Sequence, residues 1–199
     1  HIDTGIEALP ILPNKQYRQK KHKQWYAGQT IITGIGQGDV LCSPIQLARS
    51  TMLLANGGKD YPLHIVANNN PAPVESIAID ETARELVVNA MEEVIISGTG
   101  QSIGQLPYSL AGKTGSAQVS AFKDSTTYRS LPRHMKDHHL FIGFTPAQDP
   151  DMVIVVVVEH QHSALKIAKH ILDWCWNNNM MSKPPTKQPR AHHSASHPS

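Results

Sequence analysis

The chain has 199 residues, of which 40% are hydrophobic and 17% charged, and its formal net charge is +2 at pH 7. This length allows one domain with a sizeable core, or a large part of a bigger domain. The net charge is too small to require nucleic acid or an anionic membrane as a partner, so composition leaves the partner open.

The cysteines and the apolar runs indicate neither a disulfide-bonded or zinc-binding protein nor a membrane-spanning one. Cys42 and Cys175 form no C-x-x-C pair, so they indicate neither a disulfide framework nor a zinc site. The longest apolar run, Met152 to Val158, is far shorter than the roughly 20 residues that span a bilayer. The chain also starts without a signal-peptide pattern. We therefore expect no membrane segment in this chain.

Residues 1–28 form a basic lead-in with little periodic apolar content. Its lysines, mixed with Tyr17, Trp25 and Tyr26, are the residue types that neutralise phosphates and stack on bases. A solvated segment anchored by its aromatics is the favoured interpretation, so we predict an exposed, irregular lead-in and no nucleic-acid partner. The following stretch, 33–39, lacks the full G-x-G-x-x-G spacing and predicts a tight turn instead.

Three helices are predicted from caps and apolar spacing. The first begins at Ser43 and Pro44 and ends at Gly57. The second begins after Asp80 and ends in the Ser-Gly-Thr-Gly stretch at 97–100. Its predicted inward face comprises Leu86, Val87, Ala90, Met91, Val94 and Ile95. The third begins at Ser163 and runs to about Asn177, with Ile167, Ala168, Ile171 and Leu172 predicted to face inward.

Three strands are predicted at 110–119, 139–145 and 152–159, the last two joined by the proline-containing turn 146–150 in a hairpin. The apolar run 153–158 fits a central strand covered on both faces. Residues 59–79 are predicted to be loop with an extended piece at 63–67, and residues 123–137 a polar connection without periodicity. Residues 181–199 contain too little apolar surface to offset the entropy of ordering, and predict a disordered tail.

The stretch Leu110-Ala-Gly-Lys-Thr-Gly-Ser-Ala-Gln-Val119 places a lysine, two hydroxyls and two glycines between apolar residues. This pattern is typical of a strand that meets an anion. A phosphate loop is disfavoured, because its first glycine would fall at Pro107, which has no backbone N–H. The chain has no H-E-x-x-H. We interpret its histidine clusters, at 138–139, 160–162 and 192–193, as solvated loop residues and predict no metal and no cofactor.

Lys113-Thr114-Gly115 is a motif of β-lactamases and penicillin-binding proteins. A preceding helix, a Gly-Thr-Gly loop and two later strands make the setting more specific than the tripeptide. Over residues 25–175 the chain resembles the C-terminal part of the transpeptidase domain of an elongation-type class B penicillin-binding protein. The resemblance rests on Trp25-Tyr26-x-Gly-x-Thr30, Gly34-Ile-Gly-Gln-Gly38, Pro44-Ile-Gln46, Gly112-Lys-Thr-Gly-Ser-Ala-Gln-Val119, Asp137-His138 and Phe144-x-Pro146.

The resemblance implies an α+β fold, in which an antiparallel sheet is covered by helices. Residues 29–180 would supply the three C-terminal strands of that sheet and their helices. It also implies a peptidoglycan D,D-transpeptidase at the periplasmic face of the bacterial inner membrane. Peptidoglycan stem peptides and β-lactams would be its ligands, and cell-elongation proteins its partners.

The resemblance also implies a role for each residue of the motif. Lys113 would supply positive charge and a proton path beside a serine of the second family motif. The hydroxyls of Thr114 and Ser116 would face the substrate carboxylate, and the Ser116 N–H would be an oxyanion-hole donor. Gly115 would allow close approach of backbone or ligand, and Gln118 would line the same cleft.

The sequence departs from the family in its nucleophile. The family serine belongs to an S-x-x-K motif before Lys113, and no such motif precedes Lys113 here. Two later matches, Ser120 to Lys123 and Ser163 to Lys166, come after the Lys-Thr-Gly strand, and we interpret the second as a helix cap with a solvated lysine. We therefore expect one wall of an acyl-transfer site in an incomplete domain that is inactive alone. The alternative is a non-catalytic module that binds the same ligands.

Overall fold

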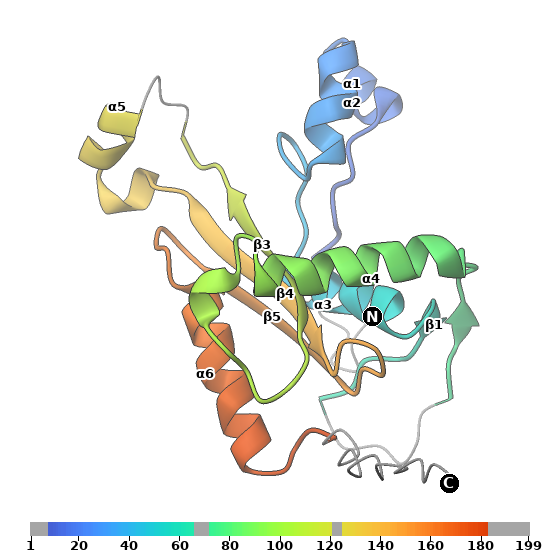
Figure 1. The fold of residues 1–199 in the computed structure, drawn as a ribbon. Coiled ribbons are helices and arrows are strands. Elements are labelled where there is room, and N and C mark those ends of the chain that lie inside the picture. Colours follow the sequence, from blue (N-terminus) through green and yellow to red (C-terminus); the bar gives the residue numbers. More distant parts are fainter. Residues whose placement is uncertain (1–7, 66–71, 121–124, 183–199) are drawn as a thin grey trace, which may run out of the picture.

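The computed structural model describes residues 8–65, 72–120 and 125–182. Its central feature is an antiparallel sheet in the order β3 (Ala111–Ala117), β4 (His138–Thr145) and β5 (Met152–Val158), seen in Figure 1. The register places Ser116 of β3 and Val158 of β5 on either side of His139. The three predicted strands and the hairpin between the last two are confirmed.

Helices cover both faces of this sheet (Figure 1). Helices α3 (Pro44–Ala55) and α4 (Glu81–Ile96) pack on one face, and α6 (Ala164–Asn177) packs on the other. Phe144 belongs to the α3–α4 side and Phe141 to the α6 side, as expected for strand residues three apart. The predicted α+β fold, with an antiparallel sheet between helices, is confirmed.

The remaining elements are short. They are α1 (Lys15–Lys20), α2 (Ala27–Gly34), β1 (Lys59–Asp60), β2 (Glu75–Ser76), α5 (Ser125–Ser130) and two 3-10 turns at Gln101–Ile103 and Arg133–Met135. Within the described part of the chain, no helix combines the length and the apolar character that crossing a membrane requires. Residues 183–199 of the predicted tail lie outside the described residues, whereas Met181 is buried against the α6-side core.

The long helices begin where capping chemistry predicts them. The Ser43 side chain accepts the Gln46 N–H, and the Gln46 side chain accepts the Ser43 N–H, which makes a capping box for α3. Asp80 caps α4 through its carboxylate. After α3 the chain turns at Gly58, where φ is +93° and an added Cβ would lie 2.0 Å from the Ile77 carbonyl oxygen. That position therefore requires glycine.

The lead-in is helical where an irregular segment was predicted. Asn14 caps α1 by accepting the Tyr17 N–H at 2.8 Å, and neither α1 nor α2 has a buried residue. Arg18 Nη1 lies 3.1 Å from Asp39 Oδ2 and ties α1 to the segment after α2. The sequence did not predict these helices, because the prediction of a helix depended on a buried apolar face. Local polar contacts hold α1 and α2 instead. The tight turn predicted at 33–39 is confirmed, with positive φ at Gly36 and Gly38.

Three further expectations need correction. Residues 125–130, predicted to belong to a connection without periodicity, form α5. The sequence did not predict this helix, because a helix this short and polar has no apolar period. Strand β5 lies at an edge of the described sheet, and β4 takes the central place predicted for the 153–158 run. The extended structure between α3 and α4 is the β1–β2 pair, whereas the predicted piece at 63–67 lies partly outside the described residues.

The predicted helix faces are confirmed in part, since Met91 and Ile95 of α4, and Ala168 and Leu172 of α6, are buried as expected. The other predicted residues are more exposed. In α4, Leu86 is 68% exposed and Val87 45% exposed, whereas Val88 is buried. In α6, Ile167 and Ile171 are 39% and 45% exposed. The residues that α6 buries are Ala164, Ala168, Leu172 and Cys175. Small residues allow α6 to approach the sheet closely, so its contact face is centred on Ala168 and not on the isoleucines.

Candidate active site

The predicted site residues lie on β3 in alternating directions. Thr114 and Ser116 share the face of the sheet that α6 covers, because Ser116 pairs with His139 and that face also carries Phe141. Lys113 and Gly115 project to the opposite face. The strand therefore places the hydroxyls of Thr114 and Ser116 on one face of the sheet and the ammonium-bearing side chain of Lys113 on the other. All three residues lie on an edge strand, and β4 pairs with only one edge of β3.

Ser116 is held from two sides. Its Oγ lies 3.2 Å from Nδ1 of His139 on the neighbouring strand. Its carbonyl accepts a hydrogen bond of 2.7 Å from Nε2 of Gln37. Gln37 lies in the glycine-rich turn after α2, so this bond joins a segment 79 residues away to the centre of the motif. Sequence reasoning assigned Gln37 no role beyond the family motif.

The other motif residues have contacts of their own. Thr114 Oγ1 lies 2.8 Å from Oγ1 of Thr99, which follows α4. Lys113 is exposed and its Nζ donates to the Thr114 carbonyl at 2.7 Å. An added Cβ at Gly115 would lie 2.6 Å from Cδ1 of Leu140, so the close approach at this glycine is with a side chain of β4.

Gln118 lies just past the end of β3. Its Nε2 donates to the Ser120 carbonyl at 3.1 Å, and the side chain is exposed. It does not line the cavity that Thr114 and Ser116 border. The structure therefore brings four of the five predicted residues together on one strand and places Gln118 at its margin.

A cavity of about 240 Å³ opens beside Thr114 and Ser116. It lies between β3, the loop after α4 and the start of α6. Its lining residues are Thr99, Ser102, Thr114, Gly115, Ser116, His139, Leu140, His162, Ala164, Leu165 and Lys166. We call it the hydroxyl cavity. Four residues with hydroxyls, two histidines and one lysine line it, and no aspartate or glutamate does, which makes it suited to an anion.

The histidines of β4 pack against those of the loop before α6, in contrast to the prediction of solvated loop residues, and one pair, His139 and His162, lines the cavity. The ring centroids of His139 and His162 are 3.6 Å apart, and those of His138 and His160 are 4.5 Å apart. Burial lowers the pKa of His139, and electrostatic repulsion between its imidazolium form and the neighbouring His162 ring acts in the same direction. Asp137 opposes this shift. The neutral imidazole is therefore favoured beside Ser116.

The sequence could not reveal this histidine pairing, because the pairs join β4 to the loop before α6. Within residues 8–65, 72–120 and 125–182, no group of three or more His, Cys, Asp or Glu side chains is placed to hold a metal ion. The 192–193 histidine pair lies outside those ranges, as does Lys123 of the first S-x-x-K match. In the second match, Ser163 precedes α6 but makes no side-chain capping bond, and Lys166 lines the hydroxyl cavity.

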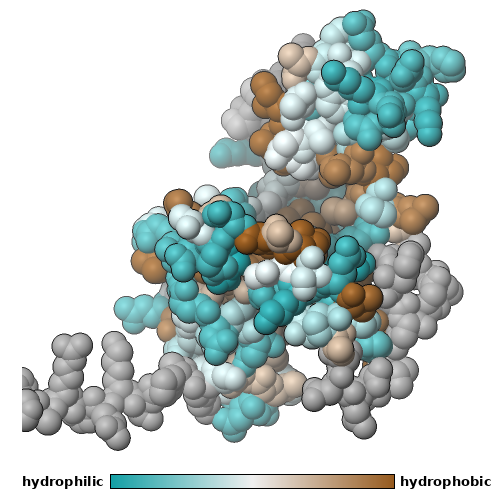
Figure 2. All heavy atoms as spheres, turned by 90° about the vertical axis from the view of Figure 1, so that its right-hand side faces the viewer, coloured by the Kyte–Doolittle hydropathy of each residue, from teal (hydrophilic) through white to brown (hydrophobic). Residues whose placement is uncertain are grey.

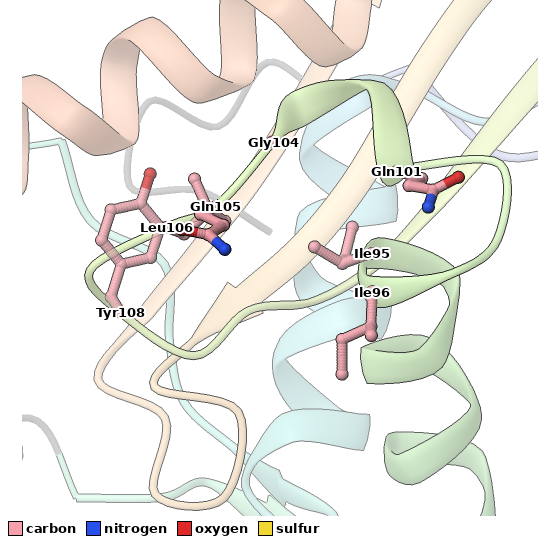
Figure 3. A pocket seen from close by; sticks show the side chains of 7 residues that line it. All are labelled: Ile95, Ile96, Gln101, Gly104, Gln105, Leu106 and Tyr108. Carbon is pink, nitrogen blue, oxygen red and sulfur yellow. The ribbon is translucent and has the colours of Figure 1, made fainter.

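A larger cavity of about 480 Å³ lies on the other side of the loop after α4. Figure 3 shows its lining residues, which come from the end of α4 and from residues 101–108. Most of its wall is aliphatic or amide. Tyr108, its titratable member, donates to Asp173 Oδ1 at 2.8 Å and thereby fastens the loop to α6. Because this cavity contains neither a nucleophile nor a charged group, we place the candidate active site at the hydroxyl cavity.

Fold and site together define a class of protein. An antiparallel sheet between helices, with Lys-Thr-Gly-Ser on one strand, is the arrangement expected of a serine transpeptidase. A family model described as the penicillin binding protein transpeptidase domain matches residues 8–174. The chain belongs to the penicillin-binding protein transpeptidase family.

Comparison with individual relatives shows which members of this family the chain resembles. The chain is 34% identical to the peptidoglycan D,D-transpeptidase MrdA of Acinetobacter baumannii over 189 residues, which cover 87% of the chain and 28% of that protein. It is 30% identical to MrdA of Salmonella typhimurium strain SL1344, over 94% of the chain and 34% of that protein. The chain thus spans about a third of the length of these relatives. The expected resemblance to elongation-type enzymes is confirmed.

Solved structures agree with these relatives. PBP2 of Pseudomonas aeruginosa, solved in complex with WCK 5153, superposes with a TM-score of 0.69 at 29% identity, over 96% of the chain and 42% of that protein. PBP2 of Helicobacter pylori, solved in complex with MreC, gives a TM-score of 0.75 over 90% of the chain and 33% of that protein. The second likeness, at 24% identity, supports the fold alone. The incomplete transpeptidase-like fold expected from the sequence is confirmed.

Proposed function

We propose that this chain carries the Lys-Thr-Gly wall of a peptidoglycan D,D-transpeptidase that acts in cell-wall elongation. The observation that carries the proposal is the placement of Thr114 and Ser116, whose hydroxyls border one anion-suited cavity beside an unpaired strand edge. Membership of the transpeptidase family and the identity to MrdA proteins support it.

In the proposed reaction, a serine oxygen attacks the carbonyl carbon of the penultimate D-alanine of a stem peptide. The peptide bond to the terminal D-alanine breaks, and that D-alanine leaves with a proton on its amine. The acyl group then passes to the amine of a neighbouring stem, which returns a proton to the serine oxygen. A β-lactam acylates the same serine because its ring amide takes the place of the scissile bond.

The residues of β3 would act on the bound stem peptide. Thr114 and Ser116 bind its terminal carboxylate through their hydroxyls, and the Ser116 N–H donates to the oxyanion, a contribution typically worth about 10²–10³ in rate. Lys113, on the other face of the strand, supplies positive charge and a proton path. Gly115 keeps the strand close to β4, and Gln118 contacts the peptide at the margin of the cleft.

The direct test is binding of a D-alanyl-D-alanine peptide to the 199-residue chain, followed by nuclear magnetic resonance of backbone amides. We expect the largest shifts at 113–117, and a loss of about tenfold in affinity when Ser116→Ala removes a hydrogen bond to a charged group. Ser50→Ala, which removes a hydroxyl from the exposed face of α3, is the matched control. Shifts confined to other parts of the chain would contradict the proposed site.

The chain alone is not expected to form an acyl-enzyme, since its S-x-x-K matches both follow Lys113. Incubation with a fluorescent penicillin should leave no covalent label, whereas a stoichiometric adduct on Ser163 would overturn this expectation. The same observation favours a second candidate, a non-catalytic module that binds stem peptides reversibly. An S-x-x-K motif encoded before residue 1 in the same reading frame would support the enzyme, and its absence there would support the binding module.

The partners and location follow from the same proposal. Stem peptides and β-lactams are the proposed ligands, and membership of the penicillin-binding family supports the second of these. We propose cell-elongation proteins as macromolecular partners and the periplasmic face of the inner membrane as the location. Both rest on the likeness to the MrdA proteins.

A further inference from the structure

Four histidines join strand β4 to the loop of residues 159–163, which connects β5 to α6. The ring centroids of His139 and His162 are 3.6 Å apart, and those of His138 and His160 are 4.5 Å apart. The His160 N–H also donates to Nδ1 of His138 at 3.3 Å. We call these four residues the histidine junction. Each of its contacts pairs a residue of β4 with a residue of the loop, so the junction fixes the loop to the sheet.

The loop itself is exposed and its backbone is strained. His160 has a φ of +57°, a left-handed conformation that residues with a Cβ rarely adopt. Its Nδ1 lies 2.8 Å from the Lys136 carbonyl, which can only accept, so this nitrogen carries a proton. Gln161 and His162 are exposed to solvent. A strained, exposed segment opens at lower free energy than the core, so the docked conformation of the loop depends on the histidine junction.

The histidine junction also reaches the candidate active site. Nδ1 of His139 lies 3.2 Å from Oγ of Ser116, and both His139 and His162 line the hydroxyl cavity. Nε2 of His139 is buried and has no hydrogen-bond partner among the described residues. A second proton on this ring would therefore leave a charged, buried N–H donor without an acceptor, which is costly. The docked loop favours the neutral ring.

The electrostatic surroundings act in the same direction. Burial lowers the pKa of His139 below its ordinary value of 6.5, repulsion from His162 lowers it further, and Asp137 opposes both. The charged side chains on the elements that carry or contact the junction are Lys113 on β3, Arg133, Lys136 and Asp137 before β4, Glu159 in the loop and Lys166 at the start of α6. Cations outnumber carboxylates in this set, so a proton added to the junction meets net positive surroundings.

The sign of the pH effect follows from these contacts. When the loop opens, the His139 ring becomes accessible to water and its pKa returns toward the ordinary value. The open state therefore binds a proton that the docked state does not, over the interval just below pH 6.5. Opening becomes more favourable as pH falls through that interval.

We propose that the histidine junction is a pH-sensitive contact that holds residues 159–163 against β4 at neutral pH and releases them in acid. On release, His139 loses the ring that packs on it, and the hydroxyl cavity loses the part of its wall that His162 provides. Ser116 stays on β3, because the sheet holds that strand independently of the loop. The inference concerns the shape of the cavity and does not depend on the ligand that the cavity takes.

The test follows the 199-residue chain by nuclear magnetic resonance from about pH 7.5 to about pH 5, the range over which imidazole ordinarily changes its charge. Nuclear Overhauser effects between the rings of His139 and His162 report the docked loop. We expect them to be lost in acid, with the open population rising by up to about tenfold per pH unit, the limit for uptake of one proton. The amides of residues 140–144 in β4 should keep their protection from exchange.

A matched variant separates charge from packing. His162→Phe keeps an aromatic ring against His139 but cannot take up a proton, and a phenyl face attracts a cation. We expect its ring contact with His139 to persist to about pH 5. His22→Asn is the control, because it removes an exposed histidine of the arm at a left-handed position (φ +53°) that asparagine tolerates. It should respond to pH like the wild type.

Two results would overturn the inference. One is a His139–His162 ring contact that persists in the wild type to about pH 5. The other is an equal loss of ring contact in the wild type and in His162→Phe, which would show that charge on His162 plays no part in the release. Because no ligand is used, neither result bears on the proposed function, and failure of a D-alanyl-D-alanine peptide to bind would leave this inference standing.

Discussion

The body around the sheet and the arm of residues 8–42 are stabilised in different ways. In the body, Phe141, Phe144 and Leu172 are fully buried between helices and strands. In the arm, α1 and α2 bury no residue, and Ile31 and Ile35 are each 70% exposed. Figure 2 shows the arm standing above the body, with hydrophobic and hydrophilic surface mixed on it.

This difference in burial indicates that the candidate site is held rigid by the body and not by the arm. Strand β3 is part of the body, so its backbone is held by β4 and by the packing of α4 and α6. The arm reaches this strand through the bond from Gln37 to the Ser116 carbonyl. Segments with few buried apolar contacts open locally at lower free energy than the core. We therefore expect the arm to open while the site strand stays folded.

The sharpest contrast should come from truncating one apolar residue in each region. Phe141→Ala should lower the free energy of unfolding by about 3–5 kcal/mol, because it leaves a cavity in the core. Ile31→Ala should change it by no more than about 0.5 kcal/mol, because that side chain remains in contact with water. Urea denaturation followed by circular dichroism measures both. Similar losses for the two variants would break the comparison.

The ion pair of Arg49 and Asp60 fixes α3 to β1 at the edge of the body. Arg49 Nε donates to Asp60 Oδ1 at 2.9 Å, and the Asp60 side chain is 8% exposed. Asp60→Asn should cost about 1–3 kcal/mol, because it replaces the buried carboxylate with an amide whose own N–H donors face the Arg49 guanidinium. Denaturant unfolding at pH 7 measures this loss, and an unchanged midpoint would contradict it.

The same pair predicts a pH dependence. Hydrogen bonding from Arg49 holds the pKa of Asp60 below its ordinary value of 3.8. A carboxyl group with a lowered pKa in the folded state contributes its stability above the unfolded-state value, and the contribution is lost as pH falls through the folded-state value. Wild-type stability should therefore fall below about pH 4 more steeply than that of Asp60→Asn. Parallel profiles would show that the pair contributes nothing.

The link between arm and body is weaker. Gln37→Ala removes one exposed hydrogen bond to the Ser116 carbonyl and should cost about 0.5–1.5 kcal/mol of local stability. Hydrogen exchange should accelerate in residues 27–42 and remain unchanged at 140–144 in β4. Acceleration throughout the sheet would mean that the arm stabilises the body, contrary to the comparison.

The smallest effect is expected within the arm itself. Asp39→Asn breaks the ion pair with Arg18, whose side chains are 38% and 14% exposed respectively. The expected cost is about 0–1 kcal/mol, and it should shrink further in high salt. Hydrogen exchange of α1 at two salt concentrations measures it. Glu81→Gln, which breaks the pair with Arg84 on α4, should leave exchange in α1 unchanged.

Part of the site could be predicted from the sequence because the motif is contiguous. Lys113 to Ser116 occupy one strand, so their alternation to opposite faces follows from strand geometry alone. Gln37, Thr99 and Lys166 could not be assigned in the same way, because each reaches the strand from a different element. Spacing in a sequence carries no information about such long-range approaches.

The sequence by itself determined the elements whose signals are local: the capped helices α3 and α4, the three strands, and the glycine turn at residues 57–58. Tertiary structure alone decided which helix faces are buried, which strand is central, and which side chains surround Ser116. The physical reason is that caps, turns and strand alternation depend on neighbours within a few residues, whereas burial depends on surfaces that meet only when the chain has folded. The pairing of Ser116 with His139 belongs to the second kind, and it completes the site that the motif begins.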